Sequence, residues 1–554
     1  MGSPAFFRIP PFPGSKAGAL VVHAVQSRET ADDAATLATQ LAEARVGGSF
    51  WAAQPAFPEN RDIVLAPDTR AQARAMLDDV ARKGLTGRSV LLGPWPSRDG
   101  IPTLRQPCDP WHLARHAAAL HTGADNDLAL VAALCGKPVR IVGEGRFAPL
   151  DKNGDAQAGL LDCIARELLQ DRAFRDPFTG QAMSARQAIA LLADWRRLID
   201  ANRQASAIFG IAHWKRVTVN ALLWDGGSSV RHASAKSRLA RSLKPGDTVL
   251  AWKTRTSPAL LEKLATRGIA IGEIEDGMIR SVGLGANCVP PLSILVDYLG
   301  AHFDPAQPSQ LEWILQNEHI SDELISRAAA LRQWLVKAGV GKYGLGSGEL
   351  ARPDDGRRRV LVTGQVEDDR SVLCGGAGLS NAEVLRQARL QEPDAWIIYK
   401  PHPDVEAGHR KGFVPDAEIL RHADEIERKA PIMALIDSVE AVHVITSLAG
   451  FEALMRGKEV ITHGVPFYAG WGLTRDLGPV PSRRARKRTL DELVAATLIL
   501  YPRYLDPVTR LPCPVETLVE RLTTGKARIT SPLVRLREAQ GQLNLLLKRL
   551  KGLH

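Results

Sequence analysis

Short runs of apolar, mostly β-branched residues alternate along this chain with longer amphipathic stretches, and this alternation constrains the fold more than any other feature. Amphipathic segments such as Ala382–Leu390 and Gly450–Arg456 separate the runs, which are short enough to be buried parallel strands. The alternation predicts an α/β fold of Rossmann-type domains, in which ligands bind beyond the carboxyl ends of the strands. The runs are Val90–Leu92, Val139–Val142, Thr248–Trp252, Val360–Val362, Trp396–Tyr399, Val442–Ile445 and Val460–Thr462.

The charge of the chain favours an anionic partner. Its 554 residues carry a net charge of +10, and the pI is near 9.4. This balance suits nucleic acid, a nucleotide-linked substrate or an acidic membrane surface. Aromatic residues make up only 5% of the chain, so nothing indicates a stacking platform for nucleic acid, and we expect no nucleic-acid partner.

The predicted compartment follows from three features that are absent from the sequence. No apolar run reaches the roughly 18 residues that a membrane span needs. Residues 1–18 have neither the charged start nor the apolar centre of a signal peptide. None of the six cysteines stands in a CxxC pair, so we expect reduced thiols and no metal site. We therefore expect a cytoplasmic protein.

An internal repeat indicates two related modules. Leu134–Gly143 and Met455–Gly464 share a Gly-Lys pair and a following apolar run, and each is followed later by an Asp-Pro-x-Thr turn. The later copy has Thr446–Glu452 before its Gly-Lys, whereas the earlier copy has Asp125–Val131 and so lacks the hydroxyl pair and the glutamate. We predict a degenerate partial module at 1–195, a complete module with halves at 205–345 and 355–530, and a tail at 531–554.

A polar segment follows the mostly apolar run Gly268–Ile274. It begins with Glu275 and Asp276 and continues through Arg280 to the glycine-rich stretch Gly283–Gly285. Glu275 is a candidate proton acceptor, and Arg280 is a candidate ligand for an anionic group. The alternative is a capped turn with a structural ion pair.

A second polar loop, Gly364–Ser371, follows the predicted strand Val360–Val362. It holds the adjacent carboxylates Glu367, Asp368 and Asp369, which repel one another unless something uses them. One of the three is a candidate nucleophile or acid/base group. The alternative is an exposed acidic loop.

Two further loops have the residue types that bind phosphate. In Tyr399–Val405, prolines flank His402, and Lys400 precedes it, which suits a phosphate or a leaving group. In Thr446–Glu452, small polar residues precede a predicted helix whose first N–H groups bind phosphate, and Glu452 lies where it could hold ribose hydroxyls. The alternatives are a core or capping histidine and an N-cap without a ligand.

Three remaining features are open to two interpretations each. The aromatic and glycine-rich segment Gly464–Leu473 is either a pocket wall or a packed turn. The basic run Arg483–Arg488 predicts a solvated face or, weakly, a nuclear signal. Leucines and basic residues in Ser531–His554 predict an amphipathic helix, either on a membrane surface or packed on its own domain.

Several of these motifs together resemble those of the bacterial capsular polysaccharide β-Kdo transferases of the KpsC type. The resemblance covers roughly residues 205–525 and includes Trp214–Arg216 at its start. It implies a GT-B-like pair of Rossmann-type domains and a metal-independent, cofactor-independent, retaining transfer of Kdo from CMP-Kdo to a lysophosphatidylglycerol lipid. The motifs are Glu275–Gly277 with Arg280–Gly285, Val289–Ser293, Gly364–Asp369, Tyr399–Val405 and Phe467–Thr474.

The resemblance also implies a role for each candidate residue. Asp369 matches the nucleophile that forms a covalent Kdo intermediate, His402 would protonate or stabilise the departing CMP phosphate, and Glu275 would be the base for the acceptor. Donor binding falls to Lys400, Thr446, Ser447 and Glu452, and acceptor or sugar binding to Asp276, Arg280 and Gln365.

The predicted function is therefore that of a glycosyltransferase in capsular polysaccharide biosynthesis. The expected partners are CMP-Kdo, a lipid-linked acceptor, capsule assembly proteins and the inner face of the cytoplasmic membrane, where the protein would lie peripherally. Two alternatives stay open: a transferase for another CMP-linked sugar acid, and a non-catalytic scaffold of the capsule assembly or export complex.

Overall fold

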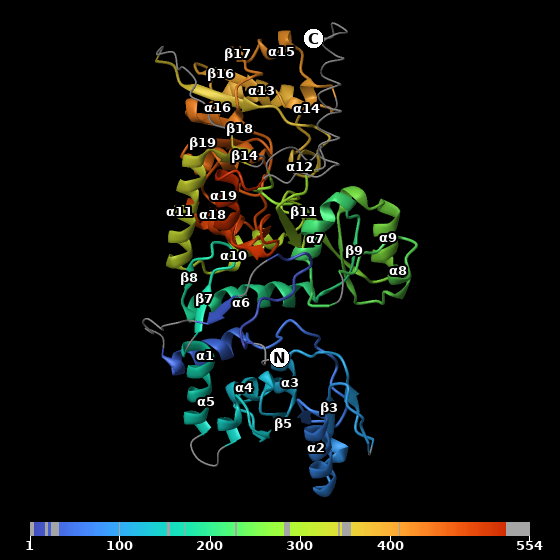
Figure 1. Ribbon diagram of the computed structural model, residues 1–554. Coiled ribbons are helices and arrows are strands. Elements are labelled where there is room, and N and C mark those ends of the chain that lie inside the picture. The colour runs from blue at the N-terminus through green and yellow to red at the C-terminus, as the bar shows by residue number, and fades with distance from the viewer. Residues whose placement is uncertain are drawn as a thin grey trace, which may run out of the picture. The chain divides into compact units, whose positions relative to one another are not determined.

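The chain forms two compact units in a computed structural model (Figure 1). Unit 1 is drawn from residues 1–204 with 223–230 and 509–511, and unit 2 from 205–222, 231–508 and 512–554. The described residues are 5–16, 20–23, 33–98, 100–151, 156–170, 172–227, 230–281, 289–341, 344–345, 356–408 and 410–527. The stretch Gly283–Gly285 and the predicted helix in 531–554 lie outside them.

Unit 1 contains a five-stranded, fully parallel sheet. Its strand order is β4-β3-β2-β5-β6. Strand β2 lies at the centre, with Val64 and Leu65 fully buried. The sheet is made of β2 (Ile63–Ala66), β3 (Ser89–Leu92), β4 (Thr103–Leu104), β5 (Ala119–Gly123) and β6 (Val139–Val142). The helices of unit 1 are α1 (Ala34–Ala44), α2 (Arg70–Arg82), α3 (Pro110–His116), α4 (Asp127–Leu134), α5 (Ala156–Ile164) and α6 (Ala185–Asn202).

The second sheet of unit 2 is also fully parallel, with the order β17-β16-β15-β18-β19-β20. It confirms the strands predicted after residue 355. Helices predicted from amphipathic patterns are present as α13 (Asn381–Gln391) and α17 (Leu448–Met455). The strands are β15 (Arg359–Thr363), β16 (Trp396–Lys400), β17 (Glu425–Ile426), β18 (Ala441–Val444), β19 (Glu459–Thr462) and β20 (Arg475–Asp476).

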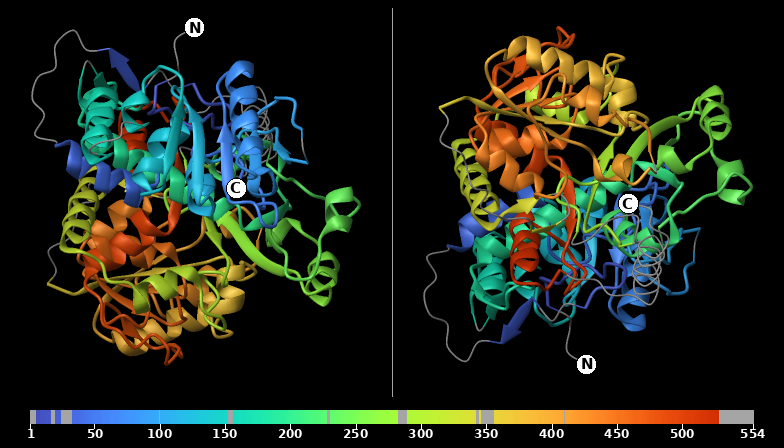
Figure 2. Two further views of the ribbon diagram at one scale, coloured as in Figure 1. Left: turned by 90° about the horizontal axis from the view of Figure 1, so that it is seen from below. Right: turned by 90° about the horizontal axis from the view of Figure 1, so that it is seen from above.

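The first sheet of unit 2 is parallel only in part. Strands β9 (Ala205–Phe209), β10 (Thr248–Ala251) and β11 (Ala270–Asp276) are parallel, and an apolar cluster packs them against α8 (Arg238–Ser242) and α9 (Pro258–Thr266), drawn in green in Figures 1 and 2.

The other half of that sheet is antiparallel. Strand β12 (Ser293–Asp297) returns beside β11, and β21 (Pro502–Leu505) and β22 (Pro512–Cys513) continue the sheet. The segment predicted as the second half, 355–530, therefore contributes strands to both sheets.

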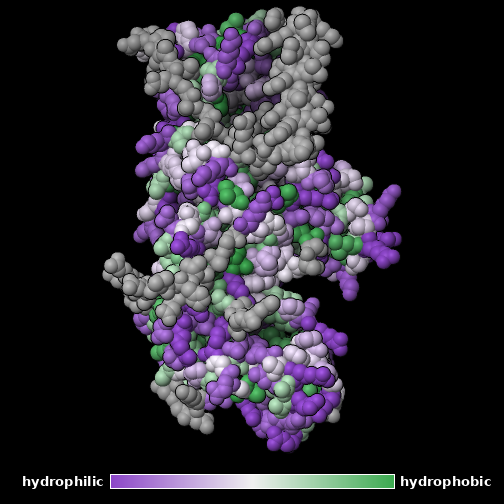
Figure 3. Space-filling view, viewed as in Figure 1, coloured by the Kyte–Doolittle hydropathy of each residue, from purple (hydrophilic) through white to green (hydrophobic). Residues whose placement is uncertain are grey.

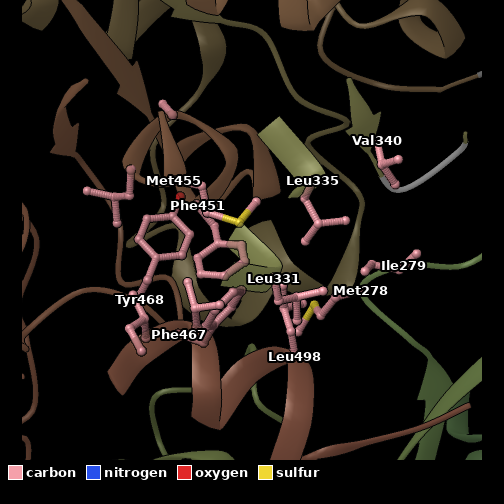
Figure 4. Close-up of a cluster of buried hydrophobic side chains, with 14 of the residues drawn as sticks. Met278, Ile279, Leu331, Leu335, Val340, Phe451, Met455, Phe467, Tyr468 and Leu498 are labelled. Carbon is pink, nitrogen blue, oxygen red and sulfur yellow. The ribbon is translucent and has the colours of Figure 1, made fainter. Parts of the chain in front are cut away.

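A large apolar cluster joins the two sheets of unit 2. It includes residues of α10 (Gln310–Asn317), α11 (Asp322–Ala338), α17 and α19 (Val515–Thr523). Helix α11 runs alongside α18 (Leu490–Val494) (Figure 1). Figure 4 shows the rings of Phe451, Phe467 and Tyr468 gathered beside Met455 in this cluster. The aromatic segment Gly464–Leu473 is thus a packed turn, and its residues Phe467–Ala469 and Trp471 are buried.

The repeat in the sequence corresponds to a repeat of structure. In both copies a strand, a helix of eight residues and a second strand follow one another, as β5-α4-β6 and as β18-α17-β19. Each copy then has a π-helical turn, a short antiparallel pair and a helix, which are β7-β8-α6 in unit 1 and β21-β22-α19 in unit 2. The central strand orders also match, β4-β3-β2-β5-β6 against β17-β16-β15-β18-β19.

The basic run Arg483–Arg488 is largely built into the fold, contrary to the prediction of a solvated face. The Arg484 guanidinium is buried and donates to Glu312 at 2.8 Å. Arg488 is also buried and donates to the carbonyls of Leu315 and Glu318 at 2.6 and 2.7 Å, at the end of α10. The run therefore satisfies carbonyl groups that a helix C-terminus leaves unpaired.

The surface in Figure 3 is mostly hydrophilic, with hydrophobic residues in scattered spots on the described part of the face shown. Within the described residues, no helix has the length and apolar character needed to cross a bilayer.

Candidate active site

Asp276 and Arg280 form a buried ion-pair network at the end of β11. The Arg280 guanidinium, 1% exposed, donates to Asp276 Oδ2 and Ser281 Oγ at 3.0 Å each and to the Val289 carbonyl at 2.9 Å. Lys215 Nζ lies 3.0 Å from Asp276 Oδ1. These two residues therefore form an ion pair, as the alternative interpretation expected, and the role of Arg280 as a ligand for an anionic group stays a prediction.

Lys215 is held from its other side by an indole ring. Its Nζ lies 3.4 Å from the centre of the Trp252 ring, a cation–π contact. Burial lowers the pKa of Lys215 to about 8, and the pairing with Asp276 partly opposes that shift. Lys215 belongs to the Trp214–Arg216 motif, so this motif helps to hold Asp276 in place.

Glu275 is the second-to-last residue of strand β11 and does not lie in a loop after it. Residues i and i+2 of a strand point to the same side, so Glu273 and Glu275 share one face of the sheet. The guanidinium of Arg370, which follows strand β15 of the second sheet along the chain, binds both carboxylates, with 3.1 Å to Glu275 Oε1. Burial and the neighbouring Glu273 charge raise the pKa of Glu275 to about 8, although Arg370 opposes that rise.

The three adjacent carboxylates of the Gly364–Ser371 loop have different surroundings. Glu367 accepts a hydrogen bond from the Asn381 N–H at 2.7 Å, and Asp368 pairs with Arg410 at 3.0 Å. Asp369 is exposed and caps α12 (Arg370–Gly375): its Oδ1 accepts from the N–H and hydroxyl of Ser371. The cap does not use Oδ2 of Asp369.

His402 is the N-cap of the short helix α14 (Pro403–Glu406). Its Nδ1 accepts the Asp404 N–H at 3.1 Å, so in the neutral ring the proton lies on Nε2. Burial lowers the pKa of His402, while the charges of Asp404 and Asp369 act in the opposite direction. Asp369 is thus close enough to act on His402 electrostatically.

Lys400 ends β16, two residues before His402. Burial lowers the pKa of Lys400, and the charges of Glu427 and Glu406 oppose that shift. The lysine and the histidine therefore lie at the same strand end, as the sequence predicts.

The loop between β18 and α17 is held in place by two side chains. Gln365 Oε1 accepts the Thr446 N–H at 2.8 Å, and Gln365 Nε2 donates to Thr446 Oγ1 at 3.2 Å. The Tyr468 hydroxyl donates to the Ser447 carbonyl. Ser447 caps α17, with its Oγ accepting the Ala449 N–H at 3.2 Å. The buried Glu452 lies one turn further along the helix.

Helix α12 is packed closely at both sheets of unit 2. A Cβ at Gly375 would lie 3.1 Å from Thr446 Cγ2 and 3.3 Å from the Phe303 carbonyl. The Arg370 guanidinium lies 4.8 Å from the centre of the Phe303 ring. The helix that follows Asp369 therefore contacts the Thr446 loop of one sheet and residues of the other.

The corresponding loop of unit 1 is filled by the chain's own carboxylates. There the Asp125 N–H, which corresponds to that of Thr446, donates to Asp68 Oδ2 at 3.1 Å. Arg146 pairs with Asp127 at 3.0 Å and with Glu167 at 3.3 Å. Burial raises the pKa of Asp68. This loop has the topology of the site in unit 2 but a different charge.

Comparison with known proteins finds similarity to capsule polysaccharide proteins. The model of the capsule polysaccharide biosynthesis proteins matches residues 348–504. The capsule polysaccharide modification protein LipA of Neisseria meningitidis serogroup A is 37% identical over 417 residues, which are 72% of this chain and 59% of LipA. The chain is thus similar to capsule polysaccharide proteins over most of its length. It spans about three fifths of the length of LipA.

Other relatives match shorter parts of the chain. The lipopolysaccharide-processing protein LpsZ of Rhizobium meliloti is 46% identical over 241 residues, 43% of this chain and 54% of LpsZ. Two solved structures of Thermosulfurimonas dismutans KpsC are also similar. The match to the β-Kdo 2,7 transferase is 32% identical, covers 58% of this chain and 99% of that chain, and has a TM-score of 0.47. The match to the β-Kdo 2,4 transferase is 30% identical, covers 57% of this chain and 98% of that chain, and has a TM-score of 0.49.

Three residues of the candidate site were not predicted from the sequence. Arg370 links the two sheets, Glu273 shares its guanidinium with Glu275, and Lys215 anchors Asp276. A signal existed for two of them, because Arg370 directly follows the three carboxylates and Glu273 alternates with Glu275 along a strand. The described residues contain no group of three or more His, Cys, Asp or Glu side chains that could hold a metal ion.

Proposed function

We propose that this chain is a retaining glycosyltransferase that moves Kdo from CMP-Kdo to a lipid-linked acceptor in capsular polysaccharide biosynthesis. One observation carries the proposal: Arg370, the residue after Asp369, binds Glu275 of the other sheet and so joins the Asp369 loop to that carboxylate. Asp369 and His402, with this second carboxylate, suit the two displacements of a retaining transfer.

In the first displacement, Asp369 Oδ2 attacks the anomeric carbon of Kdo. The bond from that carbon to the phosphate oxygen breaks, and CMP leaves with the electron pair. His402 Nε2–H stabilises or protonates the leaving phosphate, and the loop of Thr446 and Ser447 holds it at the start of α17. Lys400 adds positive charge at the same strand end.

In the second displacement, Glu275 takes the proton of an acceptor hydroxyl, and the acceptor oxygen replaces Asp369 at the anomeric carbon. A carboxyl group with a pKa of about 8 is close to the operating pH, as an efficient base should be. Glu452 would hold the ribose. Asp276, Arg280 and Gln365 support the site from behind rather than contact the sugar, since their polar groups bind neighbouring residues.

The proposal includes a location and partners. The net charge of +10 suits an anionic donor and an anionic lipid acceptor. We therefore place the protein on the inner face of the cytoplasmic membrane, with capsule assembly proteins as partners and without a metal or other cofactor.

Calorimetric titration of the full chain with CMP, and with UMP and AMP as controls, tests the donor class without an acceptor. Selective CMP binding followed by release of CMP from CMP-Kdo is the expected result. CMP binding with turnover of a different CMP-sugar acid only would replace Kdo in the proposal. Folded protein that neither binds CMP nor turns over CMP-Kdo would favour a scaffold.

A further inference from the structure

The strongest unassigned feature is the link that Arg370 makes between the two sheets of unit 2. Its guanidinium binds Glu273 and Glu275 on β11, and it stacks over the ring of Phe303. The next residue toward the N-terminus is Asp369, which caps the same helix. One residue therefore connects the backbone of the proposed nucleophile directly to the side chain of the proposed base.

We infer that Arg370 is a positioning residue, which ties the Asp369 end of α12 to the Glu275 end of β11 so that both carboxylates face one substrate. The inference rests on the proposed function for its consequence in catalysis, but not for the coupling between Arg370 and Glu275. An arginine suits this task because its planar guanidinium can bind two carboxylates at once, which an ammonium group does less well.

The contact with Arg370 matters more for Glu275 than for the neighbouring carboxylates, which have other cations beside them. Lys253 lies 2.9 Å from Glu273 and remains with it if Arg370 is removed. Lys215 and Arg280 bind Asp276. Arg370 is the cation bonded to the Glu275 carboxylate among the ion pairs of the described residues. The charged and titratable groups that face Glu275 are Glu273 and Asp276 on its own strand, Lys215 on η4 (His213–Lys215), Arg370 on α12 and the phenol of Tyr501.

Loss of Arg370 should therefore shift the pKa of Glu275 in a defined direction. Arg370 lowers the pKa of Glu275, while burial and Glu273 raise it. Without the guanidinium, the protonated and inactive form of Glu275 persists to higher pH. One opposite charge at this distance changes a carboxyl pKa by about 1–3 units.

The test measures CMP release from CMP-Kdo, with water as acceptor, between about pH 6 and pH 10 in the full chain. For Arg370→Gln at saturating CMP-Kdo, the rise of kcat with pH, which includes the second displacement, should move upward by about 1–3 pH units. Arg370→Lys keeps the charge and should move it less while still lowering kcat. Arg386→Gln, which breaks an exposed pair with Glu383 on α13, is the matched control and should leave the profile unchanged. An unshifted profile in Arg370→Gln would overturn the inference.

A second readout does not depend on catalysis. Because the folded-state pKa of Glu275 is raised from 4.5 to about 8, its contribution to stability is complete below pH 4.5 and is lost as pH rises to about 8. Arg370→Gln should extend that loss of Tm to higher pH, and Glu275→Gln should reduce the difference to the part that comes from the pair of Arg370 with Glu273. If wild-type protein releases no CMP at any pH, the proposed function fails, and the Tm series alone decides the inference. A difference that is undiminished in the Glu275→Gln background would contradict the coupling.

Discussion

At the scale of single residues, Asp369 has two roles that ordinary mutagenesis would confuse. Its Oδ1 caps α12, and its Oδ2 is the proposed nucleophile. Alanine removes both, so loss of activity in an alanine variant would not separate chemistry from folding. Asparagine is as good an N-cap as aspartate but cannot form the ester.

We therefore predict a difference between two substitutions at this position. Asp369→Asn should lose transfer, keep CMP binding and keep the Tm of the wild type. Asp369→Ala should also lose transfer, and in addition lose about 1 kcal/mol of stability with the cap. Calorimetry, chemical denaturation and CMP release measure the three quantities. Substantial turnover by Asp369→Asn would refute its role as nucleophile.

At the scale of helices and strands, Arg488 shows that a residue in a basic run, which is typical of a protein surface, can be buried and hold a helix end in place. Its buried guanidinium donates to the Leu315 and Glu318 carbonyls at the end of α10 and pairs with Glu492 at 2.6 Å. Removing a buried group of this kind leaves its acceptors unsatisfied.

Arg488→Ala should accordingly lower the free energy of unfolding by about 3 kcal/mol. Lys487→Ala removes the exposed neighbouring charge and should change it by less than about 0.5 kcal/mol. Urea unfolding of both variants gives the comparison. Equal, small effects would restore the interpretation of the run as a solvated face.

The helices and strands also show which parts of the fold can be predicted from the sequence and which cannot. The parallel strands and the polar loops after them follow from local apolar runs, and all seven predicted runs are strands. Strands β12 and β21 were not predicted, because their antiparallel pairing joins segments about two hundred residues apart. The contact of Arg370 with Glu275 spans 95 residues, and no local pattern indicates it. The burial of Arg280 and Gln365 was not predicted for a related reason: burial is a property of the packed structure, which no local pattern indicates.

At the scale of the whole molecule, the repeat gives two loops of the same topology but different chemistry. In unit 2 the loop presents Thr446 and Ser447 at the start of α17. In unit 1 the chain's own groups occupy the equivalent position, because the Asp125 N–H donates to Asp68 and the Asp127 carboxylate pairs with Arg8 and Arg146.

One nucleotide should therefore bind per chain. Titration of the full chain with CMP should give a stoichiometry near one, and Ser447→Glu, which places a carboxylate at the start of α17, should abolish it. Asp68→Asn, made in unit 1 as a control, should leave affinity and stoichiometry unchanged. Two equivalent sites, or a site that survives Ser447→Glu, would contradict this assignment.

The most direct test of the central claim is the mass of the full chain after brief exposure to CMP-Kdo without acceptor and quenching in acid. The account predicts an increase by one Kdo residue, located by peptide mapping to Asp369, with one CMP released for each chain modified. Steady release of CMP from CMP-Kdo without any modified protein, at early times and in the Glu275→Gln variant alike, would contradict a covalent intermediate on Asp369.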